Sequence, residues 1–349
     1  MINNSFFSTE ILRWFRENGR DLPWRETKDP YAIWLSEIIL QQTRIVQGWE
    51  YWERFMQTYP KVEDLAAASE DDVLKLWQGL GYYSRARNLH TAAKQIVALG
   101  SFPNTLDGIK SLKGVGDYTA AAIGSFAFDI PAAVVDGNVY RVLSRYFGID
   151  TPINSTQGKK EFAALAQSLL PASDAASYNQ GMMDFGAIQC TPQSPKCLLC
   201  PLAETCEALR SGRVEELPVK NKTVKVKTRH LSYIYIRCKS SVADGAGNTE
   251  PMVAIHRRGE GDIWQGLWEP YNVSDVKELP SFVKNPILLA KDVKHVLTHR
   301  ILLADFYLQE TETCPQLPDD YIWIKESEIE DYGVPRLIEI MLEKINPAE

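Results

Sequence analysis

The sequence has no apolar run that approaches the roughly 20 residues a membrane-spanning helix needs. Its first residues, MINNSFFSTEILRWFREN, contain no basic leader followed by an unbroken apolar stretch, so we expect no secretion signal. We therefore expect a cytoplasmic, monomeric protein with no membrane partner. The net charge of −7 gives little general attraction for nucleic acid, although binding depends on where the basic residues lie. A length of 349 residues is enough for two domains.

Cysteine is scarce, yet four of the six cysteines fall within residues 190–206. They are Cys190, Cys197, Cys200 and Cys206. In a reducing compartment, thiols this close together indicate a metal centre. Structural zinc usually takes two C-x2-C pairs, and only one is present; a single strand wrapped around the site suits an iron–sulfur cluster better. Zinc and two disulfides remain as alternatives at this point. Cys238 and Cys314 lie far from the cluster, and we expect them to be ordinary buried thiols.

Hydrophobic periodicity divides the chain into a helical part and a part rich in strands. Apolar residues recur at helical spacing in 31–43, 69–80, 84–100 and 158–170. Residues 213–229 lack apolar anchors and carry six basic against two acidic side chains, which is typical of a solvated linker. Alternating segments then follow at 231–238, 251–258, 301–309 and 321–324, with a closing helix at 335–345. We predict a helical domain over 1–212, a basic linker over 213–229 and an α+β domain over 230–349.

The stretch SLKGVGDYTAAAIGSFAF (111–128) predicts two helices joined by a tight turn. Backbone amides at such a turn point toward a helix start, where an anion binds well. Gly114 and Gly116 would let the backbone approach a DNA phosphate without an intervening side chain. A plain interhelical turn is the alternative.

Six motifs in order resemble the MutY-type adenine DNA glycosylases. They are LPWR (22–25), SEIILQQT (36–43), GLGYYSRARNL (79–89), LKGVGDYT (112–119), VVDGNVYRVLSR (134–145) and the four cysteines. The resemblance implies a mainly α helix–hairpin–helix glycosylase fold with a [4Fe–4S] cluster in the loop 190–206. It implies a base-excision repair enzyme that hydrolyses the bond between adenine and sugar opposite 8-oxoguanine or guanine in duplex DNA.

Two carboxylates carry the expected chemistry. Protonating the base and stabilising the cationic sugar need one protonated and one ionised group. Glu37 lies among Ile and Leu, where burial would keep its proton, although a polar helix stripe is the usual place for a glutamate. Asp136 precedes a helix, where it would act as an N-cap and tend to stay ionised. By resemblance they are the general acid and its electrostatic or covalent partner, and Asn138 and Tyr118 orient sugar and acid.

Position 118 also decides whether the enzyme cleaves the strand. Related glycosylase/lyases place a lysine there, whereas this chain has Tyr118, which cannot form a Schiff base. We therefore expect a monofunctional glycosylase.

The resemblance further implies residues that contact DNA. The target adenine must leave the stack, and Gln42 and Tyr82 match residues that wedge into the duplex. Trp24, Arg25 and Asp184 correspond to the adenine pocket, with Asp184 expected to accept from the exocyclic amine. Arg85, Arg87 and Lys94 are candidate phosphate contacts.

The C-terminal domain resembles the Nudix-like domain that recognises 8-oxoguanine in this family. GDIWQGLWEPYNV (261–273) is similar to a Nudix opening, but SDVKELPSFVKN follows in place of the acidic metal-binding helix, so we expect no phosphohydrolase activity. The family's lesion-recognition loop aligns with Leu297, Thr298 and His299, and the leucine replaces an aromatic residue.

Two other functions stay open. One is a glycosylase/lyase for oxidised pyrimidines, similar to endonuclease III, against which Tyr118 and the second domain speak. The other is a DNA-binding iron–sulfur redox sensor without catalysis, which would not need Glu37 and Asp136.

Overall fold

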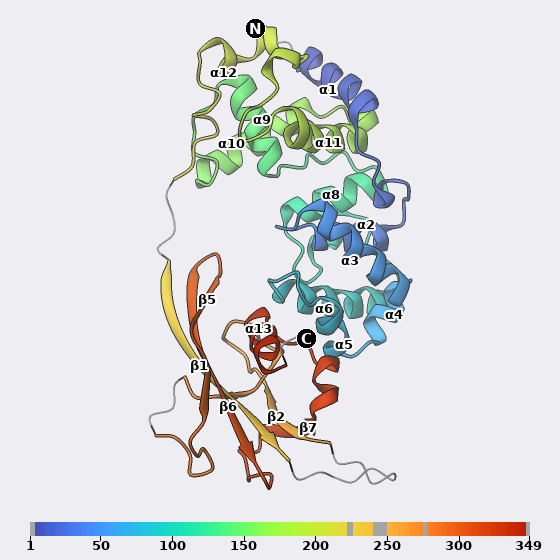
Figure 1. Ribbon diagram of the computed structural model, residues 1–349. Coiled ribbons are helices and arrows are strands. Elements are labelled where there is room, and N and C mark those ends of the chain that lie inside the picture. The colour runs from blue at the N-terminus through green and yellow to red at the C-terminus, as the bar shows by residue number, and fades with distance from the viewer. Residues whose placement is uncertain (1–3, 222–225, 240–249, 275–277, 347–349) are drawn as a thin grey trace. The chain divides into compact units, whose positions relative to one another are not determined.

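Helices build the first of the two units into which the chain divides (Figure 1). The computed structural model describes residues 4–221, 226–239, 250–274 and 278–346. The first unit comprises Met1–Ala66 and Thr91–Lys222, and the second comprises Ala67–His90 and Thr223–Glu349. The domain boundaries expected from the sequence stay a prediction, and Lys222 and Lys225 of the expected linker lie outside the described residues.

The long helices of the first unit are α1 (Asn4–Asn18), α2 (Pro30–Ile39), α3 (Ile45–Thr58), the end of α6 (Ser84–Leu99), α8 (Asp117–Phe128), α9 (Gly137–Phe147), α10 (Thr156–Leu169) and α11 (Ala175–Asp184). Shorter turns complete it: α4 (Val62–Ala67), α7 (Leu106–Lys110) and α12 (Glu207–Arg210), with single turns at Pro23–Arg25, Phe185–Gln189, Cys197–Leu199 and Ala203–Thr205. The helix expected over 31–43 ends at Ile39, because Gln42 adopts a left-handed backbone with φ 57°.

Two clusters of apolar side chains hold these helices together. In the larger cluster, Phe7 and Ile11 of α1 pack with Leu143 of α9 and Phe162 of α10. Figure 1 shows α1 beside α11, its partner from far along the chain. The smaller cluster joins α2 to α8 through Ile33, Ala122 and Phe126. The functional residues of α2, α8, α9 and α11 therefore project from a closely packed framework.

A mixed sheet forms the second unit, together with α5 (Glu70–Leu76) and α13 (Arg336–Ile345). Its main path runs β3 (Trp268–Glu269), β2 (Met252–Arg257), β1 (Lys227–Cys238), β6 (Arg300–Thr311) and β5 (Ile287–Val296). β4 (Tyr271–Asn272) pairs with β1, and β7 (Tyr321–Lys325) pairs with β2. Only β1 and β6 run parallel among these pairs in the described residues.

One face of the sheet packs on α13. Tyr233 and Phe306 of the strands meet Leu337, Ile338 and Met341 of the helix in one fully buried cluster. The described residues 278–286 contain no helix, in agreement with the missing acidic Nudix motif. The fold class expected from the sequence, a mainly α domain together with an α+β domain, is confirmed. In the described residues, no helix combines the length and the apolar character needed to cross a membrane.

The two cysteines outside the cluster form a disulfide, so the expectation of two free thiols is wrong. Cys238 ends β1, and its register partner on β6 is Thr311. The next residues of the chain bring Cys314 back to a Cα–Cα distance of 5.2 Å. Strand pairing makes neighbours of two residues that are 76 apart in sequence.

Candidate active site

Glu37 lies on a helix that is buried nearly all round. Asp29 caps α2 by accepting from Tyr31 N, and Pro30 takes the first helical position. Residues from Tyr31 to Ile39 are all buried, and only 8% of Glu37 is exposed. Burial raises the pKa of Glu37 to about 7. A carboxyl in this position keeps its proton close to neutral pH.

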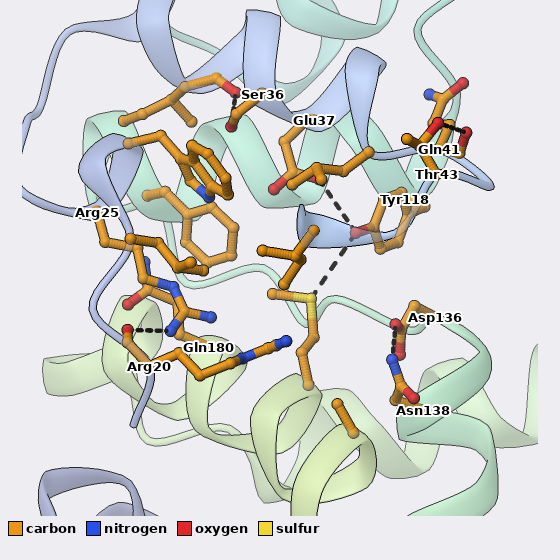
Figure 2. A pocket seen from close by; sticks show the side chains of 18 of the residues that line it. Arg20, Arg25, Ser36, Glu37, Gln41, Thr43, Tyr118, Asp136, Asn138 and Gln180 are labelled. Carbon is orange, nitrogen blue, oxygen red and sulfur yellow. Dashed lines mark hydrogen bonds between the residues drawn. The ribbon is translucent and has the colours of Figure 1, made fainter. Parts of the chain in front are cut away.

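Tyr118 donates from its hydroxyl to Glu37 Oε2 at 3.0 Å (Figure 2). This bond and the charge of Arg25 lower the pKa of Glu37, whereas the charge of Asp136 raises it, and burial outweighs them. Burial and the two carboxylates raise the pKa of Tyr118 itself well above its ordinary value. The phenol therefore stays protonated and acts as a hydrogen-bond donor.

Asp136 caps α9, as expected from its place before a helix. Its Oδ1 accepts from Val139 N at 2.7 Å, and its Oδ2 accepts from Asn138 Nδ2 at 2.8 Å. Burial nevertheless raises the pKa of Asp136, against these hydrogen bonds and the charge of Arg141. Arg141 in turn donates to Asn138 Oδ1 at 2.8 Å and to the carbonyl of Cys190 at 2.7 Å. Both oxygens of Asp136 are thus held in a fixed orientation.

Glu37 and Asp136 line one cavity of about 510 Å³. Of the residues expected at the site, the structure brings seven to this cavity: Trp24, Arg25, Glu37, Gln42, Tyr118, Asp136 and Asn138. Trp24 is buried and packs edge-to-face on Trp49 and Trp52, which fixes the plane of its ring. The cavity combines aromatic walls, two carboxyl groups and three guanidinium groups, a lining that suits a planar heteroaromatic base beside a sugar.

Asp184 is not among the residues that line this cavity, and its expected contact with an exocyclic amine stays a prediction. Its carboxylate is fully buried. Arg25 donates to both its oxygens, at 2.8 and 2.9 Å, and the backbone N of Arg20 donates to Oδ2 at 2.9 Å. Arg20 also forks onto Oδ1 with its guanidinium. Asp184 therefore positions two arginines that do line the cavity.

Gln180 and Arg20 were missed from the sequence. Gln180 lies one turn before Asp184 on α11, and it lines the cavity together with Met183. Figure 2 shows Gln180 and Arg20 at the cavity. The sequence contains no signal that separates Gln180 from Asp184, because the choice depends on which helix face meets α2 and α8.

The GVG turn joins α7 to α8. Gly114 has φ 78°, a conformation that favours glycine. Gly116 occupies the N-cap of α8 and has no side chain to cap the first turn, and a Cβ built there would meet nothing within 4 Å. The first amides of α8 thus start from an open glycine surface, as an anion-binding turn requires.

In the second unit, Tyr82 is 47% exposed and holds a left-handed backbone with φ 46°. Arg85 lies over the rings of Trp77 and Tyr82 and donates to the carbonyls of Leu80 and Gly81. Burial lowers the pKa of Arg85 to about 10.

Arg87 also makes its contacts within the protein. It donates to the backbone carbonyl of Gln265 at 2.5 Å and to its side chain at 3.2 Å. The sequence presented Arg85 and Arg87 as phosphate contacts. In the structure Arg85 donates to carbonyls of the segment that carries Tyr82, and Arg87 donates to Gln265. Their expected role as phosphate contacts stays a prediction.

Leu297, Thr298 and His299 form the turn between β5 and β6. Leu297 N donates to Arg300 O at 2.8 Å and closes the turn. The Leu297 side chain packs against the sheet core, whereas Thr298 and His299 are exposed. The Thr298 hydroxyl bonds to the Tyr82 hydroxyl. The leucine that departs from the family pattern therefore anchors the turn, and the two polar residues remain presented.

The four clustered cysteines line a second, small cavity. Burial, with a smaller contribution from the neighbouring thiols, raises the pKa of Cys200 to about 12. Arg145 is buried beside them and donates to Cys190 Sγ at 3.4 Å and to Thr191 O at 2.7 Å. Four converging thiols that ionise only with a compensating cation fit an iron–sulfur group.

Three family models match successive parts of the chain. The HhH-GPD superfamily of base excision DNA repair proteins matches residues 35–171. The iron-sulfur binding domain of endonuclease III matches residues 190–206, which decides for an iron–sulfur cluster over zinc. The NUDIX domain matches residues 247–344.

Curated relatives match part or nearly all of the chain. Adenine DNA glycosylase of Buchnera aphidicola subsp. Schizaphis graminum is 31% identical over 97% of this chain and 98% of its own. The mouse adenine DNA glycosylase is 42% identical over 61% of this chain and 44% of its own.

A solved thermostable thymine-DNA glycosylase superposes with a TM-score of 0.56 at 34% identity, covering 60% of this chain and 97% of that one. Endonuclease III in complex with DNA reaches a TM-score of 0.53 at 22% identity, over 61% of this chain and 99% of its own, and shows the fold alone.

Proposed function

The chain belongs to the MutY-type adenine DNA glycosylases, hydrolases of the N-glycosidic bond in base-excision repair, and from that premise we propose that it removes adenine mispaired with 8-oxoguanine or guanine in duplex DNA. One observation carries the mechanism. Glu37 and Asp136 line the same cavity, and burial raises the pKa of Glu37 to about 7. A protonated acid and a fixed carboxylate are the two groups that loss of a poor leaving base requires.

In the proposed reaction, adenine leaves the stack and enters the cavity. Glu37 transfers its proton to a ring nitrogen of the base. The electron pair of the C1′–N bond departs with the protonated base, and positive charge develops on the sugar. Asp136, held by Asn138 and Val139 N, stabilises that charge directly or by forming a transient bond to C1′. Water then adds to C1′, displacing any bond to Asp136, and gives its proton to the Glu37 carboxylate, which restores the acid and completes hydrolysis.

The walls of the cavity select the base. Trp24 offers a fixed ring face, and Gln180 offers an amide that can both donate to and accept from adenine. Arg25 and Arg20 are held by Asp184 and line the cavity, and we propose that their guanidinium groups donate to acceptors of the purine.

Gln42 and Tyr82 are proposed as the residues that enter the duplex. Both hold left-handed backbones, with φ 57° and 46°, a conformation that costs about 1–3 kcal/mol each and is kept where a side chain must project. Thr298 and His299 are proposed to recognise the oxidised base in the opposite strand. Their exposure on the β5–β6 turn, anchored by Leu297, supports this role.

The [4Fe–4S] cluster is held by Cys190, Cys197, Cys200 and Cys206. When bound, it supplies the positive iron that lets four half-buried thiols ionise together, and so it braces the loop 190–206. The backbone of that loop meets Arg141 and Arg145, which extend from α9. We propose that the enzyme works as a monomer on chromosomal DNA in the cytoplasm.

The test is incubation with duplexes that contain A opposite 8-oxoguanine, G or T, followed by alkali. We expect base release from the first two and little from the third. Release from none of the three, by protein that shows the absorbance of an intact iron–sulfur cluster, would exclude the proposed activity.

The monofunctional assignment has a separate test. Replacing Tyr118→Lys places a primary amine at the position where lyases carry one, and we expect borohydride to trap a covalent complex with cleaved substrate. The unaltered enzyme should give none. Trapping with the unaltered enzyme, or none with the variant, would contradict the role given to position 118.

A further inference from the structure

The Tyr118 hydroxyl has two acceptors within reach. It lies 3.0 Å from Glu37 Oε2 and 3.7 Å from Met183 Sδ (Figure 2). A phenol carries a single proton, and a thioether sulfur is a weak but real acceptor. Tyr118 can therefore bond fully to one partner only at the expense of the other.

This competition bears on the acid. The bond from Tyr118 favours the ionised form of Glu37, because a carboxylate accepts more strongly than a carboxylic acid. A general acid needs the opposite, since it must hold its proton until the base arrives. Any second acceptor for the Tyr118 hydroxyl weakens its bond to Glu37, and so weakens the effect that favours loss of the Glu37 proton.

The position of Met183 fits such a role. It lies on α11, lines the cavity, and packs half-buried between the two apolar clusters of the unit. The preceding residue, Met182, is buried in the larger cluster and does not line the cavity. Two adjacent methionines thus differ in one respect that matters here, namely contact with Tyr118.

Other charged groups face Glu37 from each neighbouring element. Asp136 approaches from the start of α9 and Arg25 from the turn Pro23–Arg25, with opposite effects on the acid. Arg44, which precedes α3, lines the cavity but is exposed. Asp184 on α11 is neutralised by Arg25 and Arg20. None of these groups changes when Met183 is replaced by leucine.

We propose that Met183 is a positioning residue of the glycosylase reaction. Its sulfur competes with Glu37 for the hydroxyl proton of Tyr118, and this competition helps Glu37 to retain its own proton. The proposal deepens the proposed function and rests on it for its kinetic consequence. In this role Met183 acts on the acid through Tyr118.

The experiment compares Met183→Leu with Met182→Leu, two substitutions of similar volume that a core tolerates well. The rate of base release in a single turnover is measured against pH on a duplex with A opposite 8-oxoguanine. With the sulfur gone, Tyr118 bonds to Glu37 alone and favours its ionised form. We expect the descending, high-pH limb of the rate profile to move to lower pH by roughly 0.3–0.7 units. A shift of this size corresponds to a fraction of the net free energy of one hydrogen bond. Above the limb the rate falls by roughly two- to fivefold.

A double substitution separates this effect from a packing defect. In a Tyr118→Phe background no proton is shared, so adding Met183→Leu should leave the limb where Tyr118→Phe alone puts it. An unmoved limb in Met183→Leu, an equal movement in Met182→Leu, or the same movement without the phenol would each overturn the proposal.

A second readout does not depend on turnover. The infrared C=O band of protonated Glu37, identified by its loss in Glu37→Gln, is titrated in the free protein with its cluster. Its midpoint should fall in Met183→Leu and not in Met182→Leu. If the midpoint falls in Met183→Leu while no duplex is processed, the proposed function fails and the effect of Met183 on Glu37 stands. If duplexes are processed and the midpoint does not move, the proposed function stands and the role of Met183 fails.

Discussion

Glu37 and Asp184 are two buried carboxyl groups of the same unit, and Arg25 interacts with both. Burial is the largest single influence on each carboxyl, and taken alone it would raise both pKa values. For Glu37 it prevails and leaves the pKa at about 7. For Asp184 the hydrogen bonds and charges of Arg25 and Arg20 prevail, and its pKa lies below the ordinary value. Hydrogen-bond partners, more than depth, decide whether a buried carboxyl is an acid ready to give a proton or a permanent anion.

The difference separates a residue that can take part in the reaction from one that holds other residues in place. Glu37 has one donor, Tyr118, and an open side toward the cavity. Asp184 has donors on both oxygens and no face toward the cavity. The first residue can exchange a proton with a ligand, and the second holds two arginines in place for that ligand.

Glu37→Gln should have the largest effect on activity. The amide keeps the shape but has no acidic proton, so we expect base release to slow by about 10²–10⁴-fold, the usual contribution of a general acid. Binding to the duplex should persist, as measured by fluorescence anisotropy. Glu17→Gln, at an exposed position of α1, is the control and should leave both quantities unchanged. Unaltered turnover in Glu37→Gln would remove the acid from the mechanism.

Asp184→Asn should act mainly on stability. Removing one partner of a buried charge network leaves Arg25 and Arg20 uncompensated and costs about 3–5 kcal/mol in the free energy of unfolding. Urea denaturation measures this loss. Asp174→Asn is the matched control, because Asp174 lies 3.9 Å from exposed Arg16 and such a pair is worth about 0–1 kcal/mol. Equal losses in the two variants would show that burial of Asp184 has no energetic consequence.

The two carboxyls should also respond to pH with opposite sign, an effect smaller than either substitution. Glu37 binds its proton more tightly when folded, so its contribution to stability falls as pH rises from its ordinary pKa of 4.5 toward about 7. Glu37→Gln should gain stability relative to the unaltered protein across that interval. Asp184 binds its proton less tightly when folded, so its stabilisation is present above pH 3.8 and is lost on acidification. The deficit of Asp184→Asn should shrink below about pH 4. Denaturation of each variant and of the unaltered protein at several pH values measures both effects. If the stabilities of the variants and of the unaltered protein changed with pH in parallel, the comparison would be refuted.

Local motifs were enough to bring Glu37, Tyr118, Asp136 and Asn138 to attention, and the structure assembles all four at one cavity. Each stands in a short segment whose own helix start or apolar run sets its surroundings. The partners of Asp184 could not be predicted, because Arg20 and Arg25 are more than 150 residues away in sequence. The carbonyl partners of Arg85 and Arg87 were missed for a similar reason, since the folded chain brings them close.

By itself, the sequence determined the fold class, because periodicity along the chain is sufficient for helices and strands. The cysteine loop and the acidic pair were singled out by motifs that resemble those of a known family. Only the tertiary structure decided that Gln180 and Arg20 line the cavity, that Asp184 stands behind it, and that Cys238 meets Cys314. The physical reason is that desolvation and hydrogen bonding act between side chains in contact, and contacts between distant segments exist only once the helices and strands have packed.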